Sequence, residues 1–242
     1  MHLFRKLGLG LLDLLLPPRC HICRKAVTSE SPLHICSDCH AVLPFICPPA
    51  CTVCGIPMDG AGDDHPCGRC IATPPPYRAA RAALRYEGAC RDLIHAFKYQ
   101  YKSHLRRPLG LLMAYNLKPF VESQCPELLV PVPLHVSRLR QRGFNQAVLL
   151  GEILSEQWQI PLLRQGLQRT RPTTPQVALT RDQRICNLLD AFQTADAEAV
   201  HQRRVMLVDD VFTTGSTLRE CSRVLLQAGC LEVSAVTIAH AP

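Results

Sequence analysis

Short apolar runs and longer helix-periodic segments alternate along the chain after residue 76. The apolar runs predict buried strands over residues 79–86, 128–132, 205–208 and 233–238. The periodic segments predict helices over residues 89–99, 104–116, 144–158 and 218–228. Regular alternation of this kind is typical of the α/β class with a doubly wound, mainly parallel sheet, whose ligands bind beyond the carboxyl ends of the strands.

The N-terminal part has a different pattern and predicts separate units. Residues 1–16 are rich in leucine, but Asp13 interrupts the run, no small-residue cleavage site follows, and the run is too short to cross a bilayer. We therefore expect a short amphipathic helix there, with contact to a membrane surface as the alternative. Residues 17–73 contain four cysteine pairs, and three consecutive prolines then form a stiff linker to an α/β domain over residues 77–242.

The charge is unevenly distributed along the chain. The net charge of +7 lies entirely in residues 76–242, because residues 1–75 contain equal numbers of basic and acidic side chains. A basic excess favours partners that carry phosphate, either a small phosphosugar or a nucleic acid. The 47% share of hydrophobic residues is typical of a globular protein, and no transmembrane or targeting segment is predicted, so we expect a cytoplasmic protein.

Eight of the fourteen cysteines form four Cys-x-x-Cys pairs, with twelve residues between the first and second pairs and again between the third and fourth. The repeat predicts two structural zinc sites, because two such pairs supply four sulfur ligands to one ion. A disulfide framework is disfavoured by the lack of a signal sequence, and an iron–sulfur cluster suits the regular pairing less well. The predicted ligands are Cys20, Cys23, Cys36 and Cys39 in one site, and Cys51, Cys54, Cys67 and Cys70 in the other.

The most specific motif follows the predicted strand at residues 205–208. Two carboxylates, Asp209 and Asp210, come directly after that strand, and a hydroxyl-rich turn then opens a helix. Backbone N–H groups and the dipole at a helix start favour an anion, whereas the carboxylates suit hydroxyl donors or a divalent cation. The motif therefore predicts a site for a ligand like ribose 5-phosphate, with an ordinary strand, turn and capped helix as the alternative. The turn consists of Thr213, Thr214, Gly215, Ser216 and Thr217.

This motif resembles the phosphoribosyl diphosphate (PRPP) site of type I phosphoribosyltransferases at nearly every position. The resemblance implies that Asp209 and Asp210 bind the ribose hydroxyls of PRPP, that the turn binds its 5-phosphate, and that Mg²⁺ accompanies it. In that family the loop after the first strand of the sheet holds pyrophosphate. The corresponding residues here are Pro133, His135, Arg138 and Arg142.

Two further runs, Arg-Gly-Phe-Asn-Gln at residues 142–146 and Thr-Thr-Pro-Gln at residues 173–176, accompany the cysteine pairs and the PRPP motif. Together they resemble the ComF family (ComFC- and GntX-like), phosphoribosyltransferase-like proteins linked to DNA uptake and natural competence. The resemblance runs from about residue 14 to the C-terminus, and it implies a phosphoribosyl ligand and competence-machinery proteins as partners. The second run lies in a polar stretch of residues 171–192 that is broken by prolines and is long enough to form a lid. The predicted lid residues are Arg171, Thr174, Gln176 and Arg184.

Residues 78–107 combine eight basic side chains with two acidic ones, and aromatic residues interleave with the lysines. Cations and aromatic rings together are typical of a surface that binds single-stranded nucleic acid. Phe97 is equally suited to the core, because it shares the apolar face of a predicted helix. The predicted nucleic-acid contacts are Lys98, Lys102, Arg106 and Arg107.

Two kinds of function fit these features. An enzyme would transfer a phosphoribosyl group from PRPP to an acceptor that the sequence does not identify, and no catalytic acid or base is assigned. A non-catalytic protein would use the same fold as a PRPP sensor or as an accessory that binds single-stranded DNA. A fold alone does not decide between them.

Overall fold

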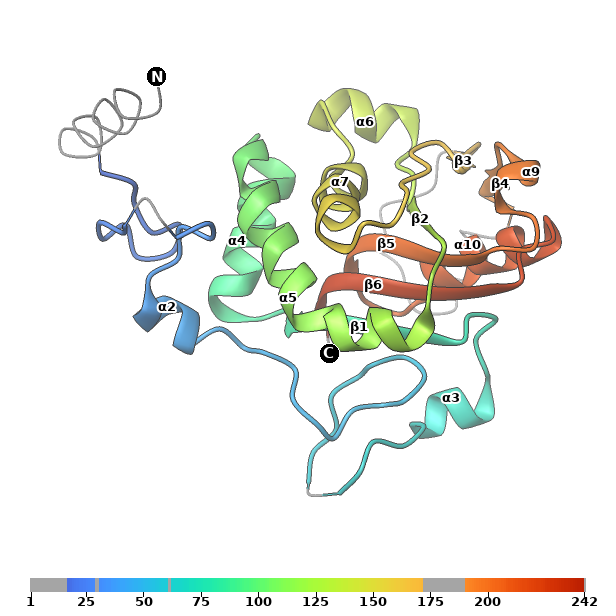
Figure 1. Ribbon diagram of the computed structural model, residues 1–242, viewed down its shortest axis with the longest axis horizontal. Coiled ribbons are helices and arrows are strands. Elements are labelled where there is room, and N and C mark those ends of the chain that lie inside the picture. The colour runs from blue at the N-terminus through green and yellow to red at the C-terminus, as the bar shows by residue number, and fades with distance from the viewer. Residues whose placement is uncertain (1–16, 29–30, 61, 172–189, 242) are drawn as a thin grey trace.

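The computed structural model describes residues 17–28, 31–60, 62–171 and 190–241, so the predicted helix at residues 1–16 lies outside the described part. A four-stranded parallel sheet forms the centre, in the order β1-β6-β5-β2 (Figure 1). The strands are β1 Ala79–Arg85, β2 Leu128–Pro131, β5 Arg204–Phe212 and β6 Glu232–His240. The predicted α/β class and parallel sheet are confirmed.

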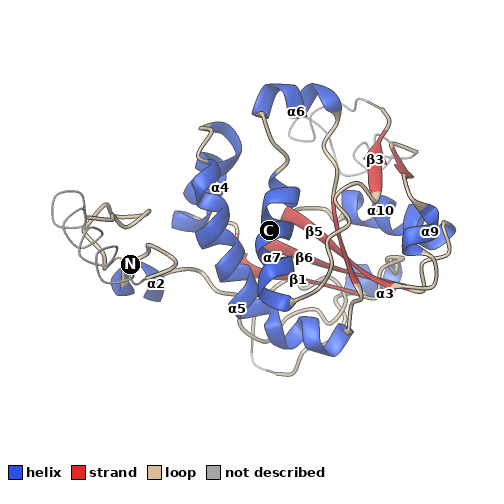
Figure 2. Cartoon of the chain, turned by 45° about the horizontal axis from the view of Figure 1, so that its top comes forward, coloured by secondary structure: helices blue, strands red, loops and turns tan. Residues whose placement is uncertain are grey.

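Helices cover both faces of this sheet (Figures 1 and 2). The two long helices α5 (Arg106–Gln124) and α7 (Gln146–Trp158) pack against each other, and together with α4 (Gly88–Tyr99) they share one hydrophobic cluster with the sheet. The amphipathic helix α10 (Ser216–Gln227) belongs to a second cluster on the other face. Alternate residues of β5 join alternate clusters, because successive strand side chains point to opposite faces.

The shorter elements connect this framework, and the sequence analysis did not predict them. They are the 3-10 helix η1 (Ser103–Leu105), the helices α6 (Val136–Arg142) and α9 (Ala197–Val200), and the antiparallel pair β3 (Leu167–Arg169) and β4 (Phe192–Thr194). Two five-residue helices, α2 (Ser37–Ala41) and α3 (Gly68–Ala72), begin directly after the first cysteine of the second and fourth pairs.

The cysteine-rich segment packs along the free edge of β1. The amide of Ile46 donates to the carbonyl of Ala83 at 3.2 Å, and the amide of Arg85 donates to the carbonyl of Pro44 at 2.8 Å. Farther along the same strand, the amide of Ala80 donates to the carbonyl of Val53 at 2.7 Å. These bonds satisfy an edge that would otherwise expose unpaired backbone groups. None of the helices in the described part of the chain is both long and apolar enough to cross a membrane.

Candidate functional site

The acidic pair lies inside β5 rather than after it. Asp209 is level with Thr237 of β6, and this pairing continues to Phe212. On the other side, β2 ends at Pro131, level with Val208. The stagger arises because β6 is longer than β2, so both carboxylates sit where β5 has a neighbour on one side only. The loop that follows β2 therefore begins beside the acidic pair, and the amide of Val132 still donates to the carbonyl of Val208 at 2.9 Å.

The predicted phosphate turn, residues 213–217, runs from the end of β5 into the first turn of α10. Gly215 has φ +76°, and a Cβ atom there would lie 2.7 Å from the ring of Phe212, so this position requires glycine. The hydroxyls of Thr214 and Ser216 are 2.8 Å apart, and the amide of Ser216 lies 3.4 Å from the Thr214 hydroxyl. The N-cap position of α10 is this glycine, which has no side chain to cap the helix, so the first turn of α10 presents its backbone to this edge of the sheet.

A buried lysine neutralises part of the charge of the acidic pair. The Lys98 Nζ lies 2.8 Å from Asp210 Oδ1, and the two side chains are only 15% and 13% exposed. Burial opposes the charge on Lys98, but Asp210, together with Asp209 and Tyr99, outweighs burial and raises the pKa of the lysine. Burial and the neighbouring Asp210 raise the pKa of Asp209 to about 7, against opposing effects of the Asp210 amide, Lys98 and Arg169. One lysine therefore leaves the pair with surplus negative charge.

Lys98 was predicted to contact nucleic acid, and its position sets it apart from the rest of that group. Its ion pair lies at the acidic pair, whereas Arg106 and Arg107 are exposed at the start of α5. Arg106 lies 3.7 Å from Glu152, and Lys102 is half-buried before η1. Of the predicted nucleic-acid contacts, Arg106 and Arg107 are therefore exposed, Lys102 is half-buried, and Lys98 belongs to the acidic pair.

The predicted pyrophosphate loop becomes the short helix α6. His135 caps it, with its Nδ1 3.3 Å from the amide of Ser137, and Gly143 ends it at φ +77°. Asn145 caps the next helix, α7, and its side-chain amide donates to the carbonyl of Val132 at 3.0 Å. The Arg-Gly-Phe-Asn-Gln run therefore ends α6, begins α7 and holds this loop beside the end of β2. Pro133 and Arg138 are half-buried along the same loop.

The end of α4 holds Arg142 in place. The Arg142 guanidinium donates to Gln146 at 3.1 Å and to the Tyr99 hydroxyl at 3.3 Å, and it lies 5.0 Å from the centroid of the Tyr99 ring. The Tyr101 hydroxyl also donates to the carbonyl of Gln141 at 3.0 Å. Lys98 and Tyr99 are adjacent in sequence, so the end of α4 connects the acidic pair to the predicted pyrophosphate loop.

Arg169 is a residue of this site that the sequence analysis missed. It ends β3, lies 5.3 Å from the ring of Phe192, and interacts electrostatically with both Asp209 and Arg138. Burial, then Arg138, lowers its pKa, while Cys221 and Asp209 oppose that shift. Of the predicted lid residues, only Arg171 is described, as an exposed residue just after β3. Thr174, Gln176 and Arg184 lie outside the described residues.

The eight paired cysteines form two four-cysteine groups, and the sulfur atoms within each group lie within 4.8 Å of one another. Backbone amides point at the sulfur atoms, as in the 3.4 Å contact from Cys36 N to Cys20 Sγ and the 3.2 Å contact from Cys67 N to Cys51 Sγ. Burial opposes a charged thiolate at Cys20 and Cys51, but these amides outweigh it and lower the pKa of each to about 6. Both groups therefore have the ligand set and the electrostatics of a structural zinc site.

The second four-cysteine group is joined firmly to the sheet. Cys51, Cys54 and Cys70 belong to the same hydrophobic cluster as Tyr77 and α10. A Cβ atom at Gly55, which has φ +71°, would lie 2.7 Å from the carbonyl of Ala80. Loss of zinc from this site would therefore disturb the face of the sheet from which the phosphate turn rises.

Comparison with known proteins finds a matching domain model and several relatives. Residues 11–71 match the family model of the double zinc ribbon domain. The chain is 39% identical over 153 residues to competence protein F of Haemophilus influenzae, a match that covers 62% of this chain and 67% of that protein. It is 34% identical over 163 residues to the DNA utilization protein YhgH of Escherichia coli, covering 66% of this chain and 71% of that protein.

A weaker structural likeness is to the glutamine PRPP amidotransferase of B. subtilis, solved with ADP and GMP. It covers 57% of this chain and 26% of that one, at 21% identity and a TM-score of 0.39. The sheet order and the strand register described above stand independently of it.

Proposed function

Because this chain belongs to the ComF family, together with competence protein F and the DNA utilization protein YhgH, we propose that it binds PRPP with Mg²⁺ and serves DNA uptake or utilisation in the cytoplasm. The observation that carries the proposal is the strand register. It brings the acidic pair of β5, the turn before α10 and the loop after β2 to one edge of the sheet. Sheets of this class bind their ligands at that edge.

The turn, the acidic pair and the arginines each have the chemistry to bind one part of PRPP. Backbone donors at the start of α10 suit the 5-phosphate, and the Thr214 and Ser216 hydroxyls are close enough to share it. Asp209 and Asp210 suit the two ribose hydroxyls, because ionised carboxylates accept hydrogen bonds. Arg138 and Arg142 supply positive charge for the pyrophosphate on the α6 side.

The acidic pair also suits the magnesium ion that accompanies PRPP. Carboxylate oxygens are the ligands that Mg²⁺ prefers. Burial first, and then the negative charge of Asp210, raise the pKa of Asp209 to about 7 even with Lys98 close by. Bound there with the diphosphate, the ion would help to neutralise the charge on a departing pyrophosphate. Asp209 and Asp210 are the residues that would hold it.

Phosphoribosyl transfer needs positioning and charge neutralisation more than covalent help from the protein. The arginines and the acidic pair supply both, and the acceptor is not identified. A PRPP sensor without turnover would use the same residues. Calorimetric titration with PRPP and Mg²⁺, followed by a screen for pyrophosphate release with candidate acceptors, distinguishes an enzyme from a sensor. Binding with no release for any acceptor would favour the sensor.

Single-stranded DNA binding is the second candidate function. It is favoured by the exposed Arg106 and Arg107 beside Lys102 and by the names of the two relatives. Replacing Arg106 and Arg107 by Ala should lower the slope of log affinity against log salt by about 1.4, since each lost phosphate contact removes about 0.7. Lys118→Ala, on the exposed side of α5, should leave the slope unchanged. Equal slopes for all variants would show that this surface does not bind single-stranded DNA.

A further inference from the structure

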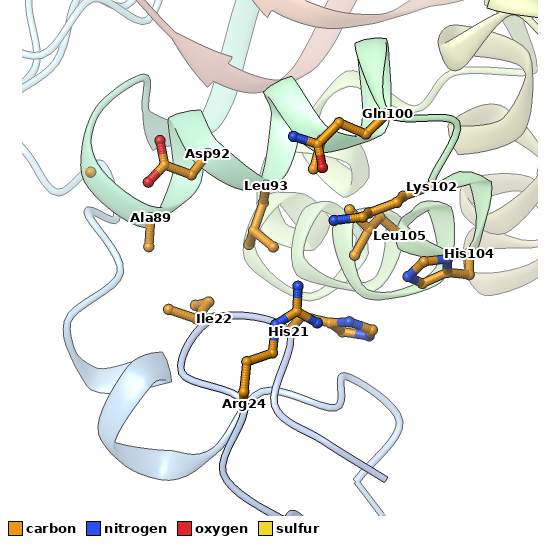
Figure 3. Close-up of a pocket in the computed structure, with 12 residues that line it drawn as sticks. His21, Ile22, Arg24, Ala89, Asp92, Leu93, Gln100, Lys102, His104 and Leu105 are labelled. Carbon is orange, nitrogen blue, oxygen red and sulfur yellow. The ribbon is translucent and has the colours of Figure 1, made fainter.

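A pocket of about 400 Å³ lies between the loop of the first four-cysteine group and the α4 side of the sheet domain (Figure 3). None of the residues assigned above to PRPP lines it. Arg24 enters it from the cysteine-rich segment, and Gln100 and Lys102 enter it from the end of α4 and the connection that follows. Its volume falls in the range of about 300–1,000 Å³ that is usual for small-molecule sites.

The floor of the pocket is apolar and fixed. Leu93 of α4 and Leu105 of η1 line it and are 6% and 2% exposed, and Ile22 packs against the same hydrophobic cluster from the loop between Cys20 and Cys23. Ile22 belongs to the cysteine-rich segment, whereas Leu93 and Leu105 belong to the sheet domain. The pocket therefore forms where these two parts of the chain pack together. A floor of this kind suits a flat apolar body such as a nucleobase, which PRPP lacks.

Two cations enter the pocket without acidic partners. In Figure 3 the Arg24 guanidinium and the Lys102 ammonium extend from opposite walls toward the same space. Among the described residues, neither forms an ion pair. Two unpaired cations over an apolar floor favour an anionic ligand, and an arginine with a lysine is a common pair for phosphate.

The remaining polar groups of the pocket are neutral or face elsewhere. The ring of His104 lies 5.5 Å from that of His21, and burial, followed by Lys102 and Arg24, lowers the pKa of His104. The ring is therefore neutral at pH 7 and offers hydrogen bonds or a stacking face. Asp92 is the carboxylate of the lining, but it is 73% exposed and lies 3.5 Å from Arg91 of its own helix.

We propose that this pocket binds one nucleotide unit, with its phosphate between Arg24 and Lys102 and its base on the floor formed by Ile22, Leu93 and Leu105. Gln100 also lines the pocket, and its amide would offer both a donor and an acceptor to the edge of the base. The same chemistry is offered by a free nucleotide and by one unit of single-stranded DNA. The pocket has room for one such unit.

The test uses the full chain with its zinc and titrates it with deoxythymidine monophosphate. The double variant Arg24→Gln, Lys102→Gln should weaken binding at least tenfold, because each change removes a charge-assisted hydrogen bond. The matched control Lys118→Gln, Arg203→Gln removes the same charge from exposed sites outside the pocket and should bind normally. Zinc content and a thermal melt verify that each variant is folded.

A second variant tests the part of the pocket that would bind the base, rather than the part that would bind the phosphate. Ala89 lines the pocket near its floor, so Ala89→Phe should fill it and weaken the monophosphate while all cations stay in place. Absence of binding by the native chain, or equal binding by all variants, would overturn the proposal. Unchanged binding by Ala89→Phe, with inorganic phosphate competing as well as the nucleotide, would reduce the pocket to an anion site and also overturn it.

An oligo(dT) arm then identifies the source of the nucleotide. If Arg24→Gln, Lys102→Gln weakens both the monophosphate and the oligonucleotide, the pocket binds a unit of the strand. If it weakens the monophosphate alone, the pocket binds a free nucleotide. Neither arm contains PRPP, so failure of the PRPP proposal would leave this test intact.

Discussion

Replacing Lys98 by Met should destabilise the sheet domain, and the loss should depend on pH. The side chain keeps its length but loses the ammonium that lies 2.8 Å from Asp210. Removing one partner of a buried ion pair costs about 3–5 kcal/mol, because the other charge stays buried and unpaired. Here the carboxyl groups can take up a proton instead, which limits the cost. We expect about 2–4 kcal/mol at pH 8.

The direction of the pH effect follows from the carboxyl groups. In the native chain the pKa of Asp209 is already raised to about 7, although both Lys98 and Arg169 favour its ionised form. Without Lys98, Arg169 is left as the cation that opposes this rise, so the pKa of Asp209 should rise further. A carboxyl whose pKa is higher in the folded state binds more protons there than in the unfolded chain. The carboxyl groups therefore contribute more to the stability of Lys98→Met as pH falls from 8 toward 5. The difference from the native chain should be largest at pH 8 and shrink at pH 5.5.

Urea unfolding followed by tryptophan fluorescence measures this, with zinc present. Trp158 is the single tryptophan, and its Nε1 donates to the carbonyl of Ala114 at 3.1 Å between α7 and α5. With a slope near 2 kcal/mol/M, the midpoint should fall by about 1–2 M at pH 8. Lys118→Met is the control, because its pair with Glu122 is 3.9 Å long and exposed, and it should cost under about 0.5 kcal/mol. Equal midpoints for both variants would refute the reasoning.

Two further predictions concern the phosphate turn and the zinc sites. Gly215→Ala should lower stability by about 1–3 kcal/mol and abolish PRPP binding, because its Cβ would meet the ring of Phe212. Gly60→Ala is the control. Gly60 also has a positive φ but has open space around it, so this variant should still bind PRPP in the same titration. Metal analysis should find about two zinc ions per chain, with one lost in Cys51→Ser and both kept in Cys125→Ser, whose cysteine is exposed and belongs to neither four-cysteine group. Iron in place of zinc, or an unchanged count in Cys51→Ser, would contradict the second prediction.

The sequence was most informative where the signal is local. Cysteine spacing predicted both four-cysteine groups, because the two ligands of a pair share one turn of the backbone. Apolar periodicity predicted the sheet strands and the main helices to within a few residues, with α5 extending beyond residue 116 to Gln124. The order of acidic pair, hydroxyl-rich turn and helix likewise appears in the structure as it does in the sequence.

Contacts between distant segments were not predictable in the same way. Lys98 belongs to a basic aromatic stretch, and nothing local distinguishes a lysine that pairs with Asp210 from one that faces solvent. The strands β3 and β4 were missed because three-residue strands carry almost no periodic signal, and Arg169 was missed with them. The extension of β5 past Asp209 depends on its pairing with β6, which only the register reveals.

The most direct test of the central claim is a calorimetric titration with PRPP and Mg²⁺ at pH 8, where Asp209 is mostly ionised. The native chain should bind, and Asp209→Asn and Asp210→Asn should each bind about tenfold to a hundredfold more weakly, because each loses a charge-assisted hydrogen bond to a ribose hydroxyl. Thr214→Val should also bind more weakly, since it loses a hydroxyl from the phosphate turn. No binding by the native chain, or equal binding by folded Asp variants, would contradict the account.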